Sequence, residues 1–535
     1  MTAMKTALRD TFVIDNLPSQ EAWPDLVFDV PEVKYPEYLN VASALLKNDP
    51  AGIAIRSEGQ TWTYREVDEI SNKIARVLVE NMKLVPGNRV LLRAPNSPMM
   101  AACWLAVLKA GGVVVATMPL LRSVELFKVL EKARVSHSLC DSRMMDELLD
   151  AKAKSKTLRT IMTFEEGDLE QQMKSKPSDF DALKTYSHDP AILAFTSGTT
   201  GKPKACIHFH SDVMAMADTF SRYILKPEGD EVFAGTPPLS FTFGLGGMLV
   251  FPFAMGASSV LNSAKGIEAV ARDIETFKVT TLFTSPTAYR ALLGFTGKYD
   301  FSSLKKCVSA GETLSKVTSD AWLEATGVRP IDGIGSTEMI HIFISASGDD
   351  IRPGATGKPV PGFRAAILDE NYEPLPPGNT GFLGIKGPTG CRYLDDQRQS
   401  DYVKGGWNVT GDIFRQDRDG YFWFKSRSDD IIISSGYNIS GPEVEDSLLA
   451  HEAVFECAVV ASPDEKRGSI VKAFVVLENS ADASDETVKA LQDHVKATIA
   501  PYKYPRAIEF LKELPKTETG KIQRFKLRAK EAGKD

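Results

Sequence analysis

The stretch Phe195–Lys204, FTSGTTGKPK, joins small hydroxyl residues and glycines to two lysines, directly after an apolar run. Unhindered backbone N–H groups and hydroxyls of this kind can wrap phosphate oxygens. A Walker A loop needs four residues between its first glycine and the Gly-Lys pair. Here only Thr199 and Thr200 separate Gly198 from Gly201, so this is not a Walker A loop. The stretch indicates another kind of phosphate site, although a polar surface turn has the same composition.

Two acidic residues follow small-residue turns further along the chain. Glu338 ends the stretch Gly333–Glu338, GIGSTE, and a carboxylate oxygen is the hard ligand that Mg²⁺ prefers when the ion also bridges phosphates. Asp412 follows Thr410-Gly411, and its two oxygens can accept both hydroxyls of a ribose. Acidic residues are also common turn formers, so neither position identifies a site by itself.

Five motifs occur together in a fixed order: the loop above, Gly333–Glu338, Thr410–Asp412, Arg427–Asp430 and Pro515–Lys521. On these motifs nearly the whole chain resembles the adenylate-forming superfamily of acyl-CoA synthetases, luciferases and peptide-synthetase adenylation domains. The resemblance implies ATP and CoA as co-substrates and Mg²⁺ as cofactor. A carboxylate would attack the α-phosphate to give an acyl-AMP, and the CoA thiol would then displace AMP.

The same resemblance assigns roles to individual residues. Glu338 would be the Mg²⁺ ligand, Thr337 would donate to the α-phosphate, and Lys521 would be the catalytic ammonium that offsets the charge between acid and phosphate. Asp429 matches the hinge of a mobile C-terminal domain, and Gly436 matches the glycine near the thiol channel. The residues expected around ATP are Thr196, Ser197, Gly198, Thr199, Thr200, Gly201, Lys202, Lys204, Gly333, Ile334, Asp412 and Arg427.

Three positions depart from the family pattern. Ile334 replaces the usual tyrosine, so adenine would pack on an aliphatic side chain. Ser426 stands where a glycine usually precedes the arginine, and Pro442 lies one place later than usual. None of these changes removes a charged catalytic group.

Within the superfamily the chain is most similar to aryl-CoA ligases for benzoate and 2-aminobenzoate. Asp332–Phe343, Ser240–Gly246 and Cys307–Glu312 carry this resemblance, and Val85–Asn96 through Gly111 favours the 2-aminobenzoate group. An aromatic acid needs an aromatic wall and thin floors. The residues expected at the acid are His210, Thr242, Phe243, Ser309, Ala310, Gly335, His341 and Ile342.

The ortho amino group of 2-aminobenzoate needs a hydrogen-bond acceptor. Ser309, Thr242 or His341 would supply it, or His341 is a packed residue with its nitrogens satisfied by backbone. His210 is expected to position the substrate or the loop, and His208 with His210 does not make a zinc site. Other acids (a hydroxybenzoate or a fatty acid), a carrier protein in place of CoA, oxygen in place of CoA, and a nucleotide-binding regulator without chemistry remain open alternatives.

These residues must be positioned by an α/β scaffold. Strands alternate with helices through residue 340, which predicts mostly parallel sheets flanked by helices. Thr63 and Glu66 predict a capping box at one helix start. Short strands and turns predict a β-rich lobe over about 351–428, so the N-terminal domain would span 1–428. Residues 429–535 would form a small, mobile α+β domain, whose tail from Lys526 is expected to be solvated.

The composition limits the possible partners. The 535-residue chain is 43% apolar and 25% charged with a net charge of −7, which predicts a soluble globular protein without general attraction to nucleic acid or anionic membranes. Its six cysteines are scattered without a CxxC pair, which suits a reducing compartment. No signal-peptide core precedes Asp10, so a cytoplasmic enzyme is expected, as a monomer or a homodimer.

Overall fold

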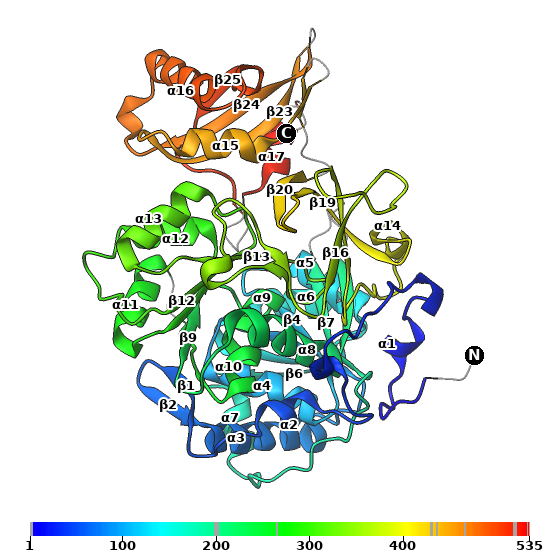
Figure 1. Cartoon of the computed structure of the whole chain (residues 1–535). Coiled ribbons are helices and arrows are strands. Elements are labelled where there is room, and N and C mark those ends of the chain that lie inside the picture. Colours follow the sequence, from blue (N-terminus) through cyan, green and yellow to red (C-terminus); the bar gives the residue numbers. More distant parts are fainter. Residues whose placement is uncertain are drawn as a thin grey trace.

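The computed structural model describes residues 4–196, 203–263, 266–427, 432–434, 437–464, 467–516, 522–531 and 533. A large N-terminal part holds two α/β sheets and a β-rich lobe, and a small unit that ends with the C-terminus sits at one end of it (Figure 1). The predicted fold class is confirmed. The predicted boundary between residues 428 and 429 lies outside the described residues.

The first sheet has six strands in the order β6-β5-β3-β4-β7-β8, all parallel except the edge strand β8. These parallel strands fit the alternation of strands and helices predicted from the sequence. Thr196 at the end of β7 pairs with Lys204 at the start of β8, so the two strands hold both ends of the phosphate-loop stretch. The bounds are β3 (Arg89–Arg93), β4 (Val113–Thr117), β5 (His137–Asp141), β6 (Thr160–Phe164), β7 (Pro190–Thr196) and β8 (Lys204–Phe209).

The second sheet has nine strands in the order β15-β14-β13-β12-β11-β9-β10-β1-β2. Its central strands, from β13 to β1, run parallel, and antiparallel strands close both edges. The bounds are β1 (Ile53–Ser57), β2 (Gln60–Thr63), β9 (Val232–Gly235), β10 (Ser258–Val260), β11 (Thr281–Thr284), β12 (Lys306–Ala310), β13 (Ile331–Gly335), β14 (Ile342–Ser345) and β15 (Lys358–Pro359).

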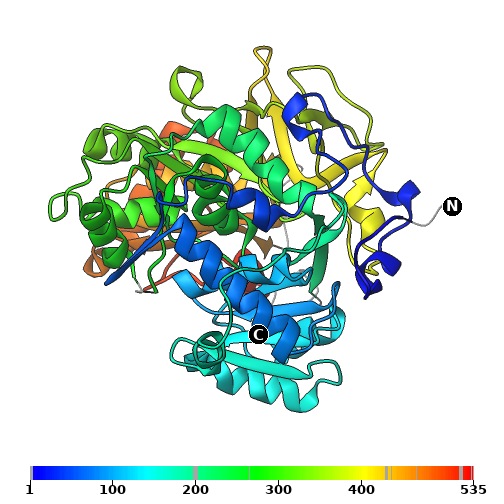
Figure 2. The same cartoon turned by 90° about the horizontal axis from the view of Figure 1, so that it is seen from below.

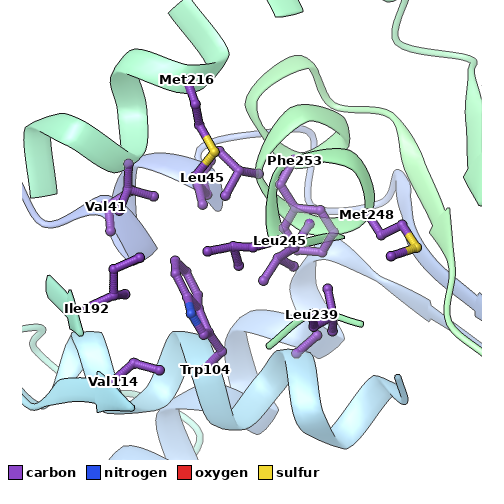
Figure 3. Close-up of a cluster of buried hydrophobic side chains, with 14 of the residues drawn as sticks. Val41, Leu45, Trp104, Val114, Ile192, Met216, Leu239, Leu245, Met248 and Phe253 are labelled. Atoms are coloured by element: carbon purple, nitrogen blue, oxygen red, sulfur yellow. The ribbon is translucent and has the colours of Figure 1, made fainter. Parts of the chain in front are cut away.

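Helix α4 (Pro98–Lys109) lies in the core of the N-terminal part. Almost all of its residues are buried, as expected of a helix that is apolar on every side. Trp104 points from it into a cluster with Val41 of α2 (Val41–Leu45), Met216 of α8 (His210–Met216) and Phe253 of α10 (Phe251–Met255) (Figure 3). This packing fixes the elements that carry the candidate site.

Other helices cover the two sheets. The predicted capping box is confirmed, because Thr63 accepts from the N–H of Glu66 while the Glu66 carboxylate accepts from the N–H of Thr63. All six cysteines are buried free thiols. No helix in the described ranges is both long and apolar enough for a membrane span. The remaining bounds are α1 (Phe12–Asp15), α3 (Tyr64–Arg76), α5 (Ser123–Lys132), α6 (Met145–Lys154), α7 (Asp168–Met173), α9 (Thr242–Leu245), α11 (Ile267–Phe277), α12 (Pro286–Leu293) and α13 (Lys316–Thr326).

The β-rich lobe follows the second sheet, as expected. The N-terminal segment runs beside it (Figure 2), where Asp25 pairs with Lys386 and Asp29 with Arg364. These ion pairs connect the N-terminal segment to strands β16 and β17 of the lobe. Its elements are β16 (Arg364–Leu368), β17 (Thr380–Lys386), α14 (Gln399–Tyr402), β18 (Val403–Lys404), β19 (Trp407–Gln416) and β20 (Phe422–Arg427).

The C-terminal unit is α+β, as predicted. Its three-stranded sheet has the order β23-β24-β25. The predicted solvated tail was wrong in part: Arg524–Glu531 is a helix, α17, whose buried Leu527 packs on Phe474 of the sheet. Glu531 also forms an ion pair with Lys472 of β24. The charged residues of this segment therefore bind the sheet, although a charged composition had suggested a solvated tail. The other bounds are β21 (Ile432–Ser434), β22 (Tyr437–Ile439), α15 (Gly441–Leu449), β23 (Val454–Asp464), β24 (Gly468–Leu477), α16 (Asp485–Thr498) and β25 (Ala507–Phe510).

Candidate active site

The carboxyl ends of β12 and β13 bring several predicted residues together. Ser309 pairs with Asp332, and Ala310 pairs with Gly333. The crevice outside the carboxyl ends of parallel strands is the usual ligand site of α/β sheets. The turn after β13 contains Thr337 and Glu338, which therefore lie close to the carboxyl end of that strand.

Glu338 lies in a nearly closed polar cluster. Its Oε1 accepts from the hydroxyl of Tyr393 at 2.5 Å, and Nζ of Lys204 lies 3.9 Å from the same oxygen. Lys204 itself donates to the Tyr393 hydroxyl at 2.9 Å. The side chain of Glu338 is 9% exposed and that of Lys204 is 21% exposed, so part of each remains accessible.

The backbone of Thr337, next to Glu338, forms a hydrogen bond with a histidine of the first sheet. His208, on β8, places Nε2 2.8 Å from the Thr337 carbonyl oxygen. Asp212 lies 3.8 Å from the opposite ring nitrogen and forms a buried ion pair with Arg392 at 2.8 Å. Burial by itself would raise the pKa of Asp212, but Arg392 and His208 hold it below its usual range. The carboxylate therefore stays charged and supports both partners.

Asp412 and Arg427, both predicted at the nucleotide, are direct neighbours. They oppose each other on β19 and β20, and Nη1 of Arg427 lies 3.0 Å from Oδ1 of Asp412. The Asp412 side chain is 9% exposed, whereas that of Arg427 is 49% exposed. The pair can therefore present a carboxylate and a guanidinium to one ligand.

The imidazole of His341 lies among aromatic rings. Its ring centroid is 4.6 Å from that of Phe251, 5.4 Å from that of Phe220 and 5.8 Å from that of Phe243. Burial lowers its pKa to about 3, although the Phe243 backbone acts in the opposite direction. Neither nitrogen has a hydrogen-bond partner among the described residues. Because the backbone of Phe243 acts on this imidazole, the packed-residue alternative stays open.

The glycines expected at the site are also constrained by the packing of the chain around them. A Cβ at Gly335 would lie 2.6 Å from the carbonyl oxygen of His341, and one at Gly333 would lie 2.8 Å from the Ile342 side chain. These glycines are required by the packing of the chain itself, besides any ligand. Gly246, which was not predicted, is equally constrained: its Cβ would lie 2.5 Å from Cδ2 of His341.

The other residues expected at the acid differ in their surroundings. Ser309 is fully buried, and its Oγ has no partner in the part of the chain that is described. Thr242 is buried at the start of α9, next to Phe243. His210 is bound elsewhere, because its Nδ1 accepts from the N–H of Val41 at 3.2 Å. Only Nε2 of His210 is left for a substrate or the loop.

Several predicted residues cannot be placed. Thr196 and Lys204 flank the phosphate-loop stretch and are paired, but the residues between 196 and 203 are outside the described ranges, as are those assigned to the hinge, the thiol channel and the catalytic lysine. The predictions that lie there are Ser197, Gly198, Thr199, Thr200, Gly201, Lys202, Asp429, Gly436 and Lys521.

The side chains near Glu338 suit a magnesium ion that takes one protein carboxylate and several phosphate oxygens as ligands. Across the described ranges, no group of three or more His, Cys, Asp or Glu side chains could hold a metal. Mg²⁺ commonly takes only one or two protein carboxylates and fills its other positions with phosphate oxygens and water. Glu338, a single nearly buried carboxylate, fits that pattern.

Sequence reasoning missed the supporting residues of the site. Tyr393 is 55 residues from Glu338, and Arg392 is 180 residues from Asp212. The stretch Cys391-Arg392-Tyr393 has no spacing or composition that distinguishes it from ordinary core. Only the pairing of β8 with this segment, through Cys206 and Tyr393, brings these residues to the site.

The chain is similar to known proteins along most of its length. A family model described as AMP-binding enzyme matches residues 43–392, and one described as AMP-binding enzyme C-terminal domain matches residues 443–521. The crystal structure of the anthranilate CoA ligase AuaEII in complex with anthranoyl-AMP has a TM-score of 0.90 at 34% identity and covers 94% of this chain and 99% of that one.

Two curated relatives represent different substrate classes. The benzoate–CoA ligase of Thauera aromatica is 35% identical over 514 residues, with 93% of this chain and 97% of the relative covered. The mitochondrial acyl-coenzyme A synthetase ACSM3 of Mus musculus is 34% identical over 532 residues, with 94% and 92% covered. Sequence identity alone therefore does not separate aromatic from other acids.

Proposed function

The chain belongs to the family of AMP-binding enzymes, and from this premise we propose that it joins 2-aminobenzoate to CoA, with benzoate as the next candidate. The broader class, an ATP-dependent ligase that forms acid–CoA thioesters, follows from the relatives along the whole chain. The choice of acid is the proposal.

The reaction has two steps. In the first, a carboxylate oxygen of the acid attacks the α-phosphorus of ATP, the bond to the β-phosphate breaks, and pyrophosphate leaves. We assign Lys521 to this step, since an ammonium between the two anions favours their approach. In the second, the CoA thiol loses its proton and attacks the aryl carbonyl, and AMP leaves. No protein nucleophile is needed.

Residues after β13 and residues of the β-rich lobe are assigned to the nucleotide. Glu338 and the phosphate oxygens would hold Mg²⁺, which neutralises phosphate charge when it is bound. Thr337 is assigned to the α-phosphate, with its backbone fixed by His208. Asp412 accepts the ribose hydroxyls, and Arg427 beside it adds a contact to the nucleotide.

One observation carries the choice of acid: buried polar atoms without partners lie where the aromatic ring is expected. The nitrogens of His341 and the hydroxyl of Ser309 are buried without described hydrogen bonds, and leaving such groups unpaired costs about 1–3 kcal/mol each. An ortho amino group can donate to the unprotonated nitrogen of the neutral imidazole. A fatty acid offers no such group.

The test is a comparison of acids of similar size. Pyrophosphate exchange and CoA-thioester formation are measured with 2-aminobenzoate, benzoate, 2-hydroxybenzoate and hexanoate. We expect the highest kcat/KM for 2-aminobenzoate, and Ser309→Ala and His341→Phe should reduce its advantage over benzoate. Hexanoate as the best substrate would refute the aromatic assignment.

Two controls address the remaining alternatives. Thioester formation with free CoA, measured against release of aryl-AMP without it, separates a CoA ligase from an enzyme that loads a carrier protein. Pyrophosphate exchange that depends on the added acid excludes a nucleotide-binding regulator without chemistry.

A further inference from the structure

Tyr393 links the two charged side chains of the predicted phosphate and metal site. It is fully buried, and its hydroxyl lies 2.5 Å from Oε1 of Glu338 and 2.9 Å from Nζ of Lys204. Nζ and Oε1 themselves are 3.9 Å apart. A direct ion pair would have them about 1 Å closer. The hydroxyl therefore stands between opposite charges.

The direction of these hydrogen bonds follows from the chemistry of the groups. An ammonium can only donate, so the tyrosine oxygen accepts from Lys204. The one proton of the hydroxyl is then directed to the carboxylate. This assignment gives the hydroxyl one hydrogen bond to each charged group, at 2.9 Å and 2.5 Å. Glu338 thus receives a hydroxyl donor in place of the ammonium itself.

The position of the hydroxyl is fixed by its own surroundings. The backbone N–H of Tyr393 donates to Gln399 at 2.9 Å, and its ring meets Tyr402 edge to face at 6.1 Å between centroids. Its neighbour Arg392 is held in the buried ion pair with Asp212. The tyrosine cannot swing away without breaking these contacts.

We propose that Tyr393 is a positioning residue that keeps Lys204 from pairing directly with Glu338 and so leaves the carboxylate for Mg²⁺. This inference rests on the proposed function. Without the hydroxyl, Lys204 can close the gap and neutralise Glu338, because attraction between unit charges rises steeply at short range in a poorly hydrated site. The ammonium would then compete with the metal for the same oxygen.

The test uses nucleotide binding without any acid. Calorimetric affinity for ATP is measured across a Mg²⁺ titration for the wild type and for Tyr393→Phe. We expect the Mg²⁺ midpoint to rise about tenfold in the variant, as for the loss of a hydrogen bond to a charged group, with ATP affinity at saturating Mg²⁺ nearly unchanged. Tyr402→Phe is the matched control, since its hydroxyl contacts Ser336 at 3.1 Å rather than Glu338, and its midpoint should stay near the wild-type value.

A second variant identifies the competitor. In a Lys204→Met background, Tyr393→Phe should barely move the Mg²⁺ midpoint, because the ammonium that would close on Glu338 is gone. Equal shifts in both backgrounds would overturn the inference. So would an unchanged midpoint in Tyr393→Phe, or an ATP affinity that falls equally at every Mg²⁺ concentration, which is the signature of a merely structural residue. Failure of the proposed function appears separately, as wild-type protein that never releases pyrophosphate with any acid.

Discussion

His208 and Thr337 are 129 residues apart, yet the imidazole Nε2 of one lies 2.8 Å from the carbonyl oxygen of the other. The strand after the phosphate-loop stretch thereby holds the backbone of the Thr-Glu pair. Both motifs thus share one support, and a displacement of β8 would disturb both.

Replacing His208 by leucine should slow adenylate formation by about tenfold or more, because the part-buried Thr337 carbonyl then keeps only the N–H of Ile340 among its two hydrogen-bond partners and Thr337 and Glu338 shift. Acid-dependent pyrophosphate exchange measures this rate. His188→Leu is the control, since its imidazole contacts the Lys5 carbonyl and the Tyr186 ring and neither motif of the site. Similar losses in both variants would contradict a specific role for His208.

Gly246→Ala should impair the acid pocket selectively. The added methyl would meet the ring of His341 at 2.5 Å, and such overpacking should raise the KM for the aromatic acid by about tenfold while leaving the KM for ATP alone. Gly297→Ala adds the same methyl where no atom lies within 4 Å, and its kinetics should match the wild type. A rise in the KM for ATP instead would place Gly246 elsewhere in the mechanism.

Acid should destabilise the fold through His341. Its pKa is lowered by burial from 6.5 to about 3, so between these values the unfolded chain binds a proton that the folded chain does not. Stability therefore falls as the pH drops through this window, by up to about 1.4 kcal/mol per unit from this residue. The free energy of unfolding of His341→Phe, measured by urea titration, should fall less steeply with acid than that of the wild type. A constant difference between the two proteins would show that His341 is not the group responsible.

The ion pair of Asp212 and Arg392 should matter far more than one at the surface. Both side chains are almost fully buried, and Asp212→Asn would leave a buried guanidinium without its charge partner, at a cost of about 3–5 kcal/mol. The exposed pair of Asp29 and Arg364 is the control, and Asp29→Asn should hardly change the unfolding midpoint. Equal effects would mean that Arg392 is well solvated.

Lys521→Ala should separate the two half-reactions. Formation of aryl-AMP should fall by about two orders of magnitude or more, while CoA transfer from supplied aryl-AMP stays near normal. Lys526→Ala removes an exposed lysine nearby and should affect neither half. Equal loss in both halves for Lys521→Ala would indicate a structural lysine.

Local patterns predicted most of the fold. The capping box at Thr63, the alternation of strands with helices and the turn-rich lobe depend on neighbours in sequence, so they could be recognised there. The resemblance also assigned Ser309 to the acid and Gly333 to ATP, and the two residues lie on the neighbouring strands β12 and β13. Helix α17 was missed because its charges pair with β24 and β25, which sequence periodicity does not reveal.

The supporting contacts of the site could not be predicted in the same way. Tyr393 reaches Glu338 only because its segment bridges to β8, and Gly246 is constrained by a ring almost a hundred residues away. Such contacts depend on the register of distant segments. The roles of Lys521, Asp429 and the phosphate-loop residues remain predictions.

The burial of all six native thiols allows fluorescent labels to be attached selectively to cysteines introduced at the surface. Desolvation raises the pKa of each of them, from Cys103 to Cys457. Maleimide dyes should therefore not react with the native chain. Cysteines introduced at the exposed positions Val124 and Lys526 would then be the only reactive sites. A donor and an acceptor fluorophore attached there would follow the distance between α5 of the N-terminal part and α17 of the C-terminal unit during turnover, without a cysteine-free background.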